Sequence, residues 1–90
     1  TRKLGHLIRA RNATCPAPGC EASSYHCDLD HTQPWPDGPT DECNIGPPCR
    51  HHHRTKQAPG WNLSQPEPGT FRWTTPSGRT YETRPTRYDL

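Results

Sequence analysis

A small α+β domain held together by metal ions is the fold class that the sequence predicts. Only fourteen of the 90 residues are Leu, Ile, Phe, Trp or Tyr. Burial of so few large apolar side chains does not offset the conformational entropy lost when a chain of this length folds. The chain also carries five Cys and six His, a mixture typical of zinc sites, and an odd number of cysteines cannot pair fully into disulfides. We therefore expect metal ligation to replace the missing core.

The first expected element is a helix over residues 2–11. Leu4, Leu7 and Ile8 lie at positions i, i+3 and i+4 in a stretch without proline, which is the spacing of an amphipathic helix. The next segment, Cys15-Pro-Ala-Pro-Gly-Cys20, contains two prolines and a glycine, which exclude a helix or a central strand. It is expected to form a tight turn, a knuckle, that brings two sulfur atoms together.

The middle of the chain is expected to contain a strand, a loop and a helix. Apolar and polar residues alternate over residues 25–31, which predicts a short strand with polar groups on one face. Residues 32–42 hold three prolines and predict a loop, ordered by Trp35. Residues 49–56 contain no helix breaker, and Pro48 suits the first position of a helix of about two turns.

The end of the chain is expected to form a hairpin. Residues 58–60 and 65–69 are rich in proline and glycine and are interpreted as linkers. Apolar residues alternate with polar ones on both sides of the turn at residues 76–78, the pattern of a β-hairpin. The chain is thus interpreted as one domain, with a leading helix at 1–12, a core at 13–57 and a trailing segment at 58–90.

Four residues are predicted to bind a structural zinc ion. The knuckle supplies Cys15 and Cys20, and a helical spacing of three places Cys49 and His52 on one face. Zinc contributes about 10 to 16 kcal/mol to the folding of small metal-dependent peptides, which is what this poor core lacks. The alternatives are buried thiols without metal, Cys27 as a competing ligand and His51 in place of His52; Cys43 has no assigned role.

A second group of residues, Asp30-His31, Asn44 and His53, resembles the HNH (His-Asn-His) endonucleases, which have a ββα-metal fold. The similarity extends to HNH domains at the C-terminal end of larger bacterial proteins and covers residues 9 to 83. The segments that carry it are Cys27-Asp-Leu-Asp-His-Thr-Gln-Pro34, Gly38-Pro39-Thr40, Asn44-Ile45, Cys49-Arg-His-His-His-Arg-Thr-Lys56 and Trp73-Thr-Thr-Pro-Ser-Gly-Arg-Thr-Tyr81, together with the Cys-x4-Cys knuckle. Many members of the family have Cys at the position of His52.

The resemblance implies a ββα-metal core and a role for each matching residue. His31 falls on the general base that takes a proton from water. Asp30 and His53 fall on the ligands of one catalytic divalent ion, Mg²⁺ or Mn²⁺, with Ni²⁺ or Zn²⁺ as further candidates. Asn44 falls on the middle residue, which in the family either orients the loop that holds the base or lies close to the metal, and we favour orientation. The implied reaction is hydrolysis of DNA to 5′-phosphate and 3′-hydroxyl ends. His52 and His53 are adjacent, so they point about 100° apart on a helix and can serve different ions.

Charge is consistent with a nucleic-acid partner but does not require one. The net charge is only +2, yet basic residues lie before the first Cys and within the His run. The expected contacts to backbone phosphates are Arg9, Arg11, Arg50, Arg54 and Lys56; the alternative is an ordinary solvated surface. We expect a cytoplasmic protein with no membrane segment, and the sequence specifies neither a DNA sequence preference nor an oligomeric state.

Two other classes of protein compete with a DNA endonuclease. One is a zinc-stabilised DNA-binding module without catalysis, which has no need for the combination of Asp30, Asn44 and His53. The other is a secreted disulfide protein, which would lose its structure in reductant and not in chelator.

Overall fold

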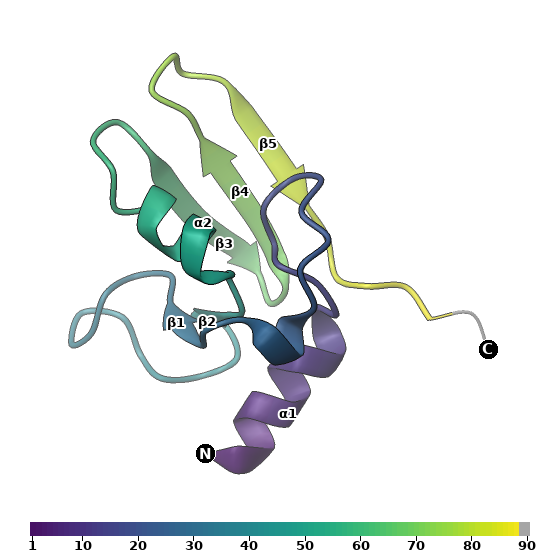
Figure 1. Cartoon of the computed structure of the whole chain (residues 1–90). Coiled ribbons are helices and arrows are strands. Elements are labelled where there is room, and N and C mark those ends of the chain that lie inside the picture. Colours follow the sequence, from purple (N-terminus) through teal and green to yellow (C-terminus); the bar gives the residue numbers. More distant parts are fainter. Residues whose placement is uncertain (89–90) are drawn as a thin grey trace.

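The computed structural model describes residues 1–88, so the last two residues of the expected 58–90 segment, Leu90 among them, lie outside the description. A small α+β fold with two sheets is confirmed (Figure 1). In chain order the elements are α1 (Arg2–Arg11), a 3-10 turn η1 (Ser24–His26), β1 (Asp30–His31), β2 (Ile45–Gly46), α2 (Arg50–Thr55), β3 (Asn62–Glu67), β4 (Thr70–Thr74) and β5 (Thr80–Thr83).

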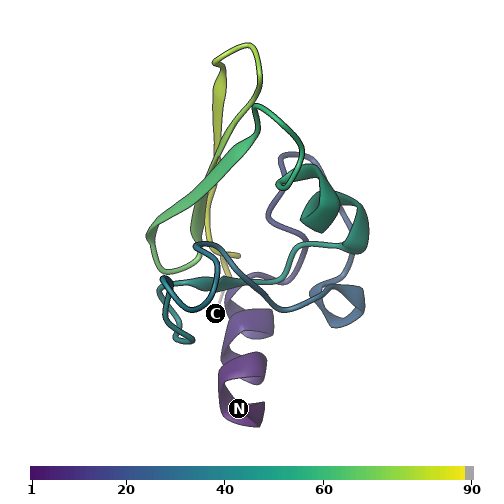
Figure 2. The same ribbon diagram turned by 90° about the vertical axis from the view of Figure 1, so that its left-hand side faces the viewer.

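The larger sheet and α2 enclose the core. Strands β3, β4 and β5 form an antiparallel sheet in that order. Viewed along the edge of this sheet, α2 and the segment that carries the knuckle lie on one of its faces (Figure 2). Phe71 and Trp73 of β4 are buried there with Cys15, Ala17 and Cys27. The core is therefore built largely from cysteines and aromatic rings, as the scarcity of aliphatic residues requires.

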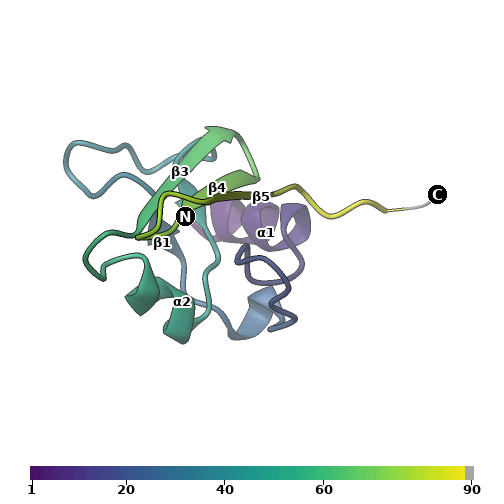
Figure 3. The same cartoon turned by 90° about the horizontal axis from the view of Figure 1, so that it is seen from above.

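The predicted helix over residues 2–11 is confirmed as α1. The Thr1 side chain caps it by accepting a hydrogen bond from the backbone N–H of Leu4 (3.2 Å), and Ile8 is fully buried. The segment after β5 passes the end of α1, where the backbone N–H of Thr86 donates to the carbonyl of Arg11 (2.8 Å), and then leads away from the sheet (Figure 3). The C-terminal part of the described chain is thus held against the same helix that forms its N-terminal part.

The two-stranded sheet joins the segments that flank the long loop. Asp30 pairs with Gly46 and His31 with Ile45 in antiparallel register. Ring atoms of Phe71 lie 2.5 and 2.6 Å from the position that a Cβ atom on Gly46 would occupy. Only glycine leaves room for the aromatic ring here, which lets β2 lie against the core.

The predicted strand over residues 25–31 is wrong except at its last two residues. Residues 24–26 form η1, because the Ser23 hydroxyl accepts from the Tyr25 N–H (3.3 Å) and the Ser24 hydroxyl donates to the Arg9 carbonyl (3.1 Å). Serine side chains that bind nearby backbone groups favour turns over strands. Polar and apolar residues alternate through this turn although it belongs to no sheet, so the alternation does not indicate a strand here.

The expected linker at residues 65–69 is also partly wrong, because residues 62–67 form β3. Pro66 is tolerated since β3 is an edge strand with an irregular register between Ser64 and Glu67. The hairpin on either side of residues 76–78 is confirmed as β4 and β5, with Trp73 opposite Tyr81.

The helix expected over residues 49–56 is confirmed over Arg50–Thr55, but its start differs. Cys49 is the N-cap, and Pro48 precedes it instead of occupying the first helical position. The loop at residues 32–42 is present, but Trp35 does not order it, because this side chain is 67% exposed. Asn44 fastens the loop instead, as described below.

Candidate functional site

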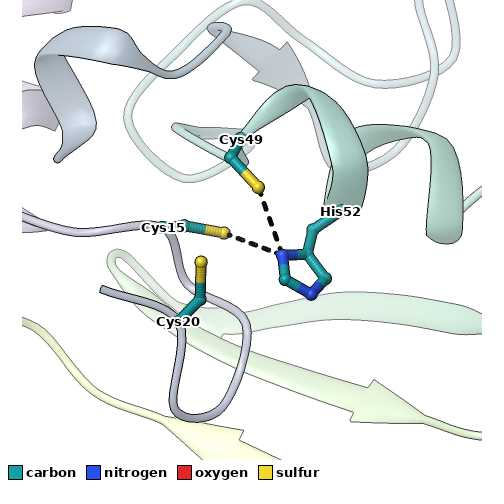
Figure 4. A group of neighbouring side chains, drawn as sticks. All are labelled: Cys15, Cys20, Cys49 and His52. Carbon is teal, nitrogen blue, oxygen red and sulfur yellow. Dashed lines mark hydrogen bonds between the residues drawn. The ribbon is translucent and has the colours of Figure 1, made fainter. Parts of the chain in front are cut away.

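Four side chains from two separate segments converge where the knuckle meets the start of α2. Cys15 and Cys20 lie at the two ends of the knuckle, Cys49 caps α2, and His52 lies one turn into it (Figure 4). Their ligand atoms all lie within 4.8 Å of one another. The His52 Nδ1 atom is 3.2 Å from Sγ of Cys49 and 3.5 Å from Sγ of Cys15. Three sulfurs and one imidazole in this arrangement can hold a metal ion such as zinc.

The surroundings of this cluster shift the pKa values of its donors in different directions. Burial raises the pKa of the Cys15 thiol to about 12. At Cys49 burial also acts to raise the pKa, but hydrogen bonds from the His52 backbone and from the neighbouring thiols outweigh it and lower the pKa. Burial lowers the pKa of His52, which keeps the imidazole neutral. A divalent ion would stabilise the thiolates that the buried site otherwise disfavours.

The other thiols and His51 stand outside this group. Cys27 is buried, and its Sγ donates to the Ser23 carbonyl at 3.2 Å. Burial raises the pKa of Cys27 to about 11. His51 and Cys43 are exposed, and all five cysteines, which lie within residues 1–88, are free. The four-donor group therefore contains the residues that the spacing predicts.

A second cluster lies where β1 meets α2. The imidazole of His53 lies between two carboxylates: Nδ1 is 3.0 Å from Oδ2 of Asp28 and Nε2 is 3.2 Å from Oδ1 of Asp30. Asp28 lies in the segment that leads into β1, Asp30 is the first residue of β1, and His53 is on the side of α2 that faces them. An oxygen and an imidazole nitrogen, from Asp30 and His53, are thus close enough to bind one divalent ion.

Each carboxylate in this cluster also binds a basic side chain. Arg50 donates two hydrogen bonds to Asp28, at 2.8 and 3.1 Å, and Lys56 donates to Oδ2 of Asp30. Hydrogen bonds from Arg50 and His53 lower the pKa of Asp28, so this carboxylate is ionised. The same contact raises the pKa of Arg50. Each of the two carboxylates is therefore paired with one basic side chain, Asp28 with Arg50 and Asp30 with Lys56.

His31 lies beside this cluster in β1. Its Nε2 atom is 2.7 Å from the Thr40 hydroxyl, and its ring centre is 6.2 Å from that of Trp35. Asn44 holds the intervening loop by hydrogen bonds to the backbone of Gln33 and Pro39. A pocket of about 490 Å³ opens beside these groups, lined in part by Asp30, His31, Trp35 and Lys56.

The five basic residues expected at DNA differ in what they contact. Arg9 donates to the carbonyl of Ser24 at 3.1 Å, and Arg11 donates to those of Glu42 and Ile45, both at 2.8 Å. Burial lowers the pKa of Arg11. The Lys56 side chain is only 9% exposed. Arg54 is exposed and forms no ion pair within residues 1–88.

Asp28 is the residue of this cluster that the sequence analysis did not single out. Its signal was available, because residues two apart in an extended chain point to the same side, and Asp28 and Asp30 are two apart. Without the fold, nothing distinguished it from the exposed acidic residues of the following loop.

A small α+β domain with four side chains that could hold a metal ion is the class of protein that this fold and its site define. Within residues 1–88 no helix is long and apolar enough to cross a membrane. No family model matches the chain, and no solved structure matches it.

The sequence is similar to proteins of Mycobacterium tuberculosis. It is 45% identical over 84 residues to the uncharacterized proteins Rv2100 and Rv3776 of strain H37Rv, which covers 92% of this chain. It is 28% identical over 71 residues, or 78% of this chain, to the uncharacterized protein Rv1128c. The matched region spans 15 to 16% of the length of these relatives.

Proposed function

We propose that this chain is a divalent-metal-dependent DNA endonuclease domain of the HNH type. The observation that carries the proposal is a pair of ligand atoms, Oδ1 of Asp30 and Nε2 of His53, that lie 3.2 Å apart. His31 follows Asp30 in β1 and lines the same pocket as Asp30. The order of elements supports it, because β1, β2 and α2 follow one another as a ββα unit. The four-donor zinc site would be structural, since its protein ligands fill all four positions.

His31 is suited to act as the general base. A neutral imidazole carries a nitrogen lone pair that can accept a proton from water. The Thr40 hydroxyl holds Nε2, which leaves Nδ1 as the nitrogen that accepts the proton. Asn44 is suited to a positioning role, because it fixes both the start of the loop at Gln33 and its far side at Pro39.

Asp30 and His53 would hold the catalytic ion, either Mg²⁺ or Mn²⁺. When bound, this ion would supply positive charge that stabilises the transition state and the leaving 3′ oxygen of the phosphodiester. Lys56 neutralises the second oxygen of Asp30 and so keeps Oδ1 available toward His53. Arg54, with its guanidinium exposed, is the basic residue best placed to contact a DNA phosphate.

The test is nicking of supercoiled plasmid by the zinc-loaded domain, with and without added Mg²⁺ or Mn²⁺, beside a mobility-shift assay for DNA binding. We expect nicks that require the added ion and that DNA ligase can reseal, because the products carry 5′-phosphate and 3′-hydroxyl ends. Binding without nicking under every ion would contradict the proposal and indicate a zinc-stabilised DNA-binding module.

A further inference from the structure

Asp28 lies behind the imidazole of His53, on the side away from Asp30. We infer that Asp28 is a positioning residue, which fixes the orientation of His53 so that Nε2 is presented to the divalent ion. The inference deepens the proposed function and rests on it. It assigns a role to a carboxylate that is neither the expected base nor an expected metal ligand.

The geometry around His53 separates the two carboxylates by role. Oδ2 of Asp28 is 3.0 Å from Nδ1, and Oδ1 of Asp30 is 3.2 Å from Nε2. Of the two contacts, the one from Nδ1 to Asp28 has the geometry of a hydrogen bond. An ionised carboxylate can only accept hydrogen bonds, so we assign the proton to Nδ1. A neutral imidazole then has its lone pair on Nε2, the nitrogen that faces Asp30.

Asp28 is itself held rigidly. Arg50 binds both of its carboxylate oxygens, at 2.8 and 3.1 Å. The backbone N–H of Asp28 donates to the carbonyl of Pro48 at 3.0 Å, which ties the residue to the chain just before α2. A bidentate arginine fixes the plane of a carboxylate as well as its position. Arg50, Asp28 and His53 therefore form a connected chain on one side of α2.

Asp30 is arranged differently. Lys56 binds its Oδ2 atom, and Oδ1 is left facing the ring of His53. The metal ligands thus meet on the Asp30 side of the ring, and Asp28 supports the ring from the other side. Carboxylates that bind the second nitrogen of a ligating histidine typically change metal affinity by about 10- to 100-fold when they are removed.

The experiment measures Mn²⁺ binding to the zinc-loaded protein from the EPR signal of free Mn²⁺. His53→Ala first identifies the site by abolishing its binding. Asp28→Ala is expected to weaken Mn²⁺ binding by about 10- to 100-fold, and Asp28→Asn by less, because the amide oxygen still accepts from Nδ1 without the charge. The matched control is Glu82→Ala in β5, which removes a carboxylate that forms ion pairs with Arg72 and Arg84.

Plasmid nicking over a range of Mn²⁺ concentrations gives the second readout. Asp28→Ala should need more Mn²⁺ for half-maximal nicking and recover most of the wild-type rate at saturation, which a general loss of structure would not produce. Zinc content checks folding, and Asp28→Asn answers the question if the alanine variant does not fold. The inference would be overturned if the Asp28 variants and Glu82→Ala needed the same Mn²⁺ concentration for half-maximal nicking.

These readouts separate the inference from the proposed function. If the wild type nicks DNA and the Asp28 substitutions leave Mn²⁺ binding unchanged, the proposed function stands and the positioning role of Asp28 is refuted. If Mn²⁺ binding to the wild type depends on both His53 and Asp28 but DNA is never cleaved, the positioning role is supported and the endonuclease is contradicted.

Discussion

The side-chain amide of Asn44 binds both backbone groups of Gln33. The Gln33 N–H donates to Oδ1 at 2.8 Å, and Nδ2 donates to the Gln33 carbonyl at 2.9 Å and to the Pro39 carbonyl at 2.9 Å. Asn44 is 7% exposed and lies directly before β2, whose partner strand carries His31. One buried amide therefore joins the strand pair to the loop that contains Thr40.

Asn44→Ala is expected to destabilise the domain by about 2 to 3 kcal/mol, because buried backbone groups lose their partners. Nicking should fall as well, since the loop no longer holds His31. Gly38→Ala should have the same effects, because its Cβ would lie 2.0 Å from the Gln33 carbonyl oxygen and 2.4 Å from Nδ2 of Asn44. Urea unfolding and plasmid nicking measure both.

Gly5→Ala is the control for this pair. Gly5 lies in α1, and the added methyl group would meet the ends of two flexible side chains, Nη1 of Arg9 at 3.2 Å and Cδ1 of Leu29 at 3.3 Å. Its stability and nicking should stay near those of the wild type. An Asn44→Ala variant as active as Gly5→Ala would exclude a role for Asn44 in positioning the base.

The zinc site predicts opposite outcomes for two partly or fully buried cysteines. Cys49→Ala should lose the bound zinc and most of the structure, because it removes one of the four donors and leaves the others unable to enclose the ion. Cys27→Ala should keep one zinc per chain, because its sulfur donates to a backbone carbonyl. Metal content and circular dichroism distinguish them; equal zinc in both variants would refute the assignment.

Two tryptophans should differ sharply in their contribution to stability. Trp73 is 2% exposed, its indole N–H donates to the Pro16 carbonyl at 3.1 Å, and its ring lies beside His52. Trp73→Ala should cost about 3 to 5 kcal/mol or prevent folding. Trp35→Ala should change the free energy of unfolding by less than about 0.5 kcal/mol, because the side chain is exposed. Thermal unfolding of the zinc-loaded variants measures both, and equal costs would contradict the described packing.

Two arginines should separate stability from DNA binding. Arg11→Ala removes hydrogen bonds to the carbonyls of Glu42 and Ile45 and should destabilise the domain by about 2 kcal/mol. Arg54→Ala should leave stability unchanged but weaken DNA binding and reduce its dependence on salt concentration. Denaturant unfolding and DNA titrations at several salt concentrations test the pair. Unaltered DNA binding by Arg54→Ala would remove it from the interface.

The sequence predicted those elements whose determinants lie close together in the chain. The spacing of Leu4 and Ile8 defines α1, alternation about one turn defines the last hairpin, and short Cys and His spacings identify the four-donor site. Residues 62–67 were missed because Pro66 indicates a linker unless the strand is known to be at the edge of a sheet.

Contacts between distant segments account for what the sequence analysis missed. Arg11 donates a hydrogen bond to the carbonyl of Ile45. No local sequence pattern reveals this contact, so the sequence analysis expected the Arg11 side chain to contact DNA. Asp28 lies against Arg50 and His53 only after α2 has folded back toward β1. Contacts between a side chain and a distant backbone carbonyl, or between side chains of two elements, depend on the three-dimensional arrangement. They cannot be predicted from the spacing of residues in the sequence.

The central claim is that His31 removes a proton from the attacking water. The most direct measurement compares Mn²⁺-dependent plasmid nicking by the wild type and by His31→Ala, each carrying one structural zinc. A positioned general base contributes about 10²- to 10⁴-fold to a rate, so His31→Ala should lose at least the lower of these factors. Equal nicking by the two proteins would contradict the account and assign the activity to a contaminant.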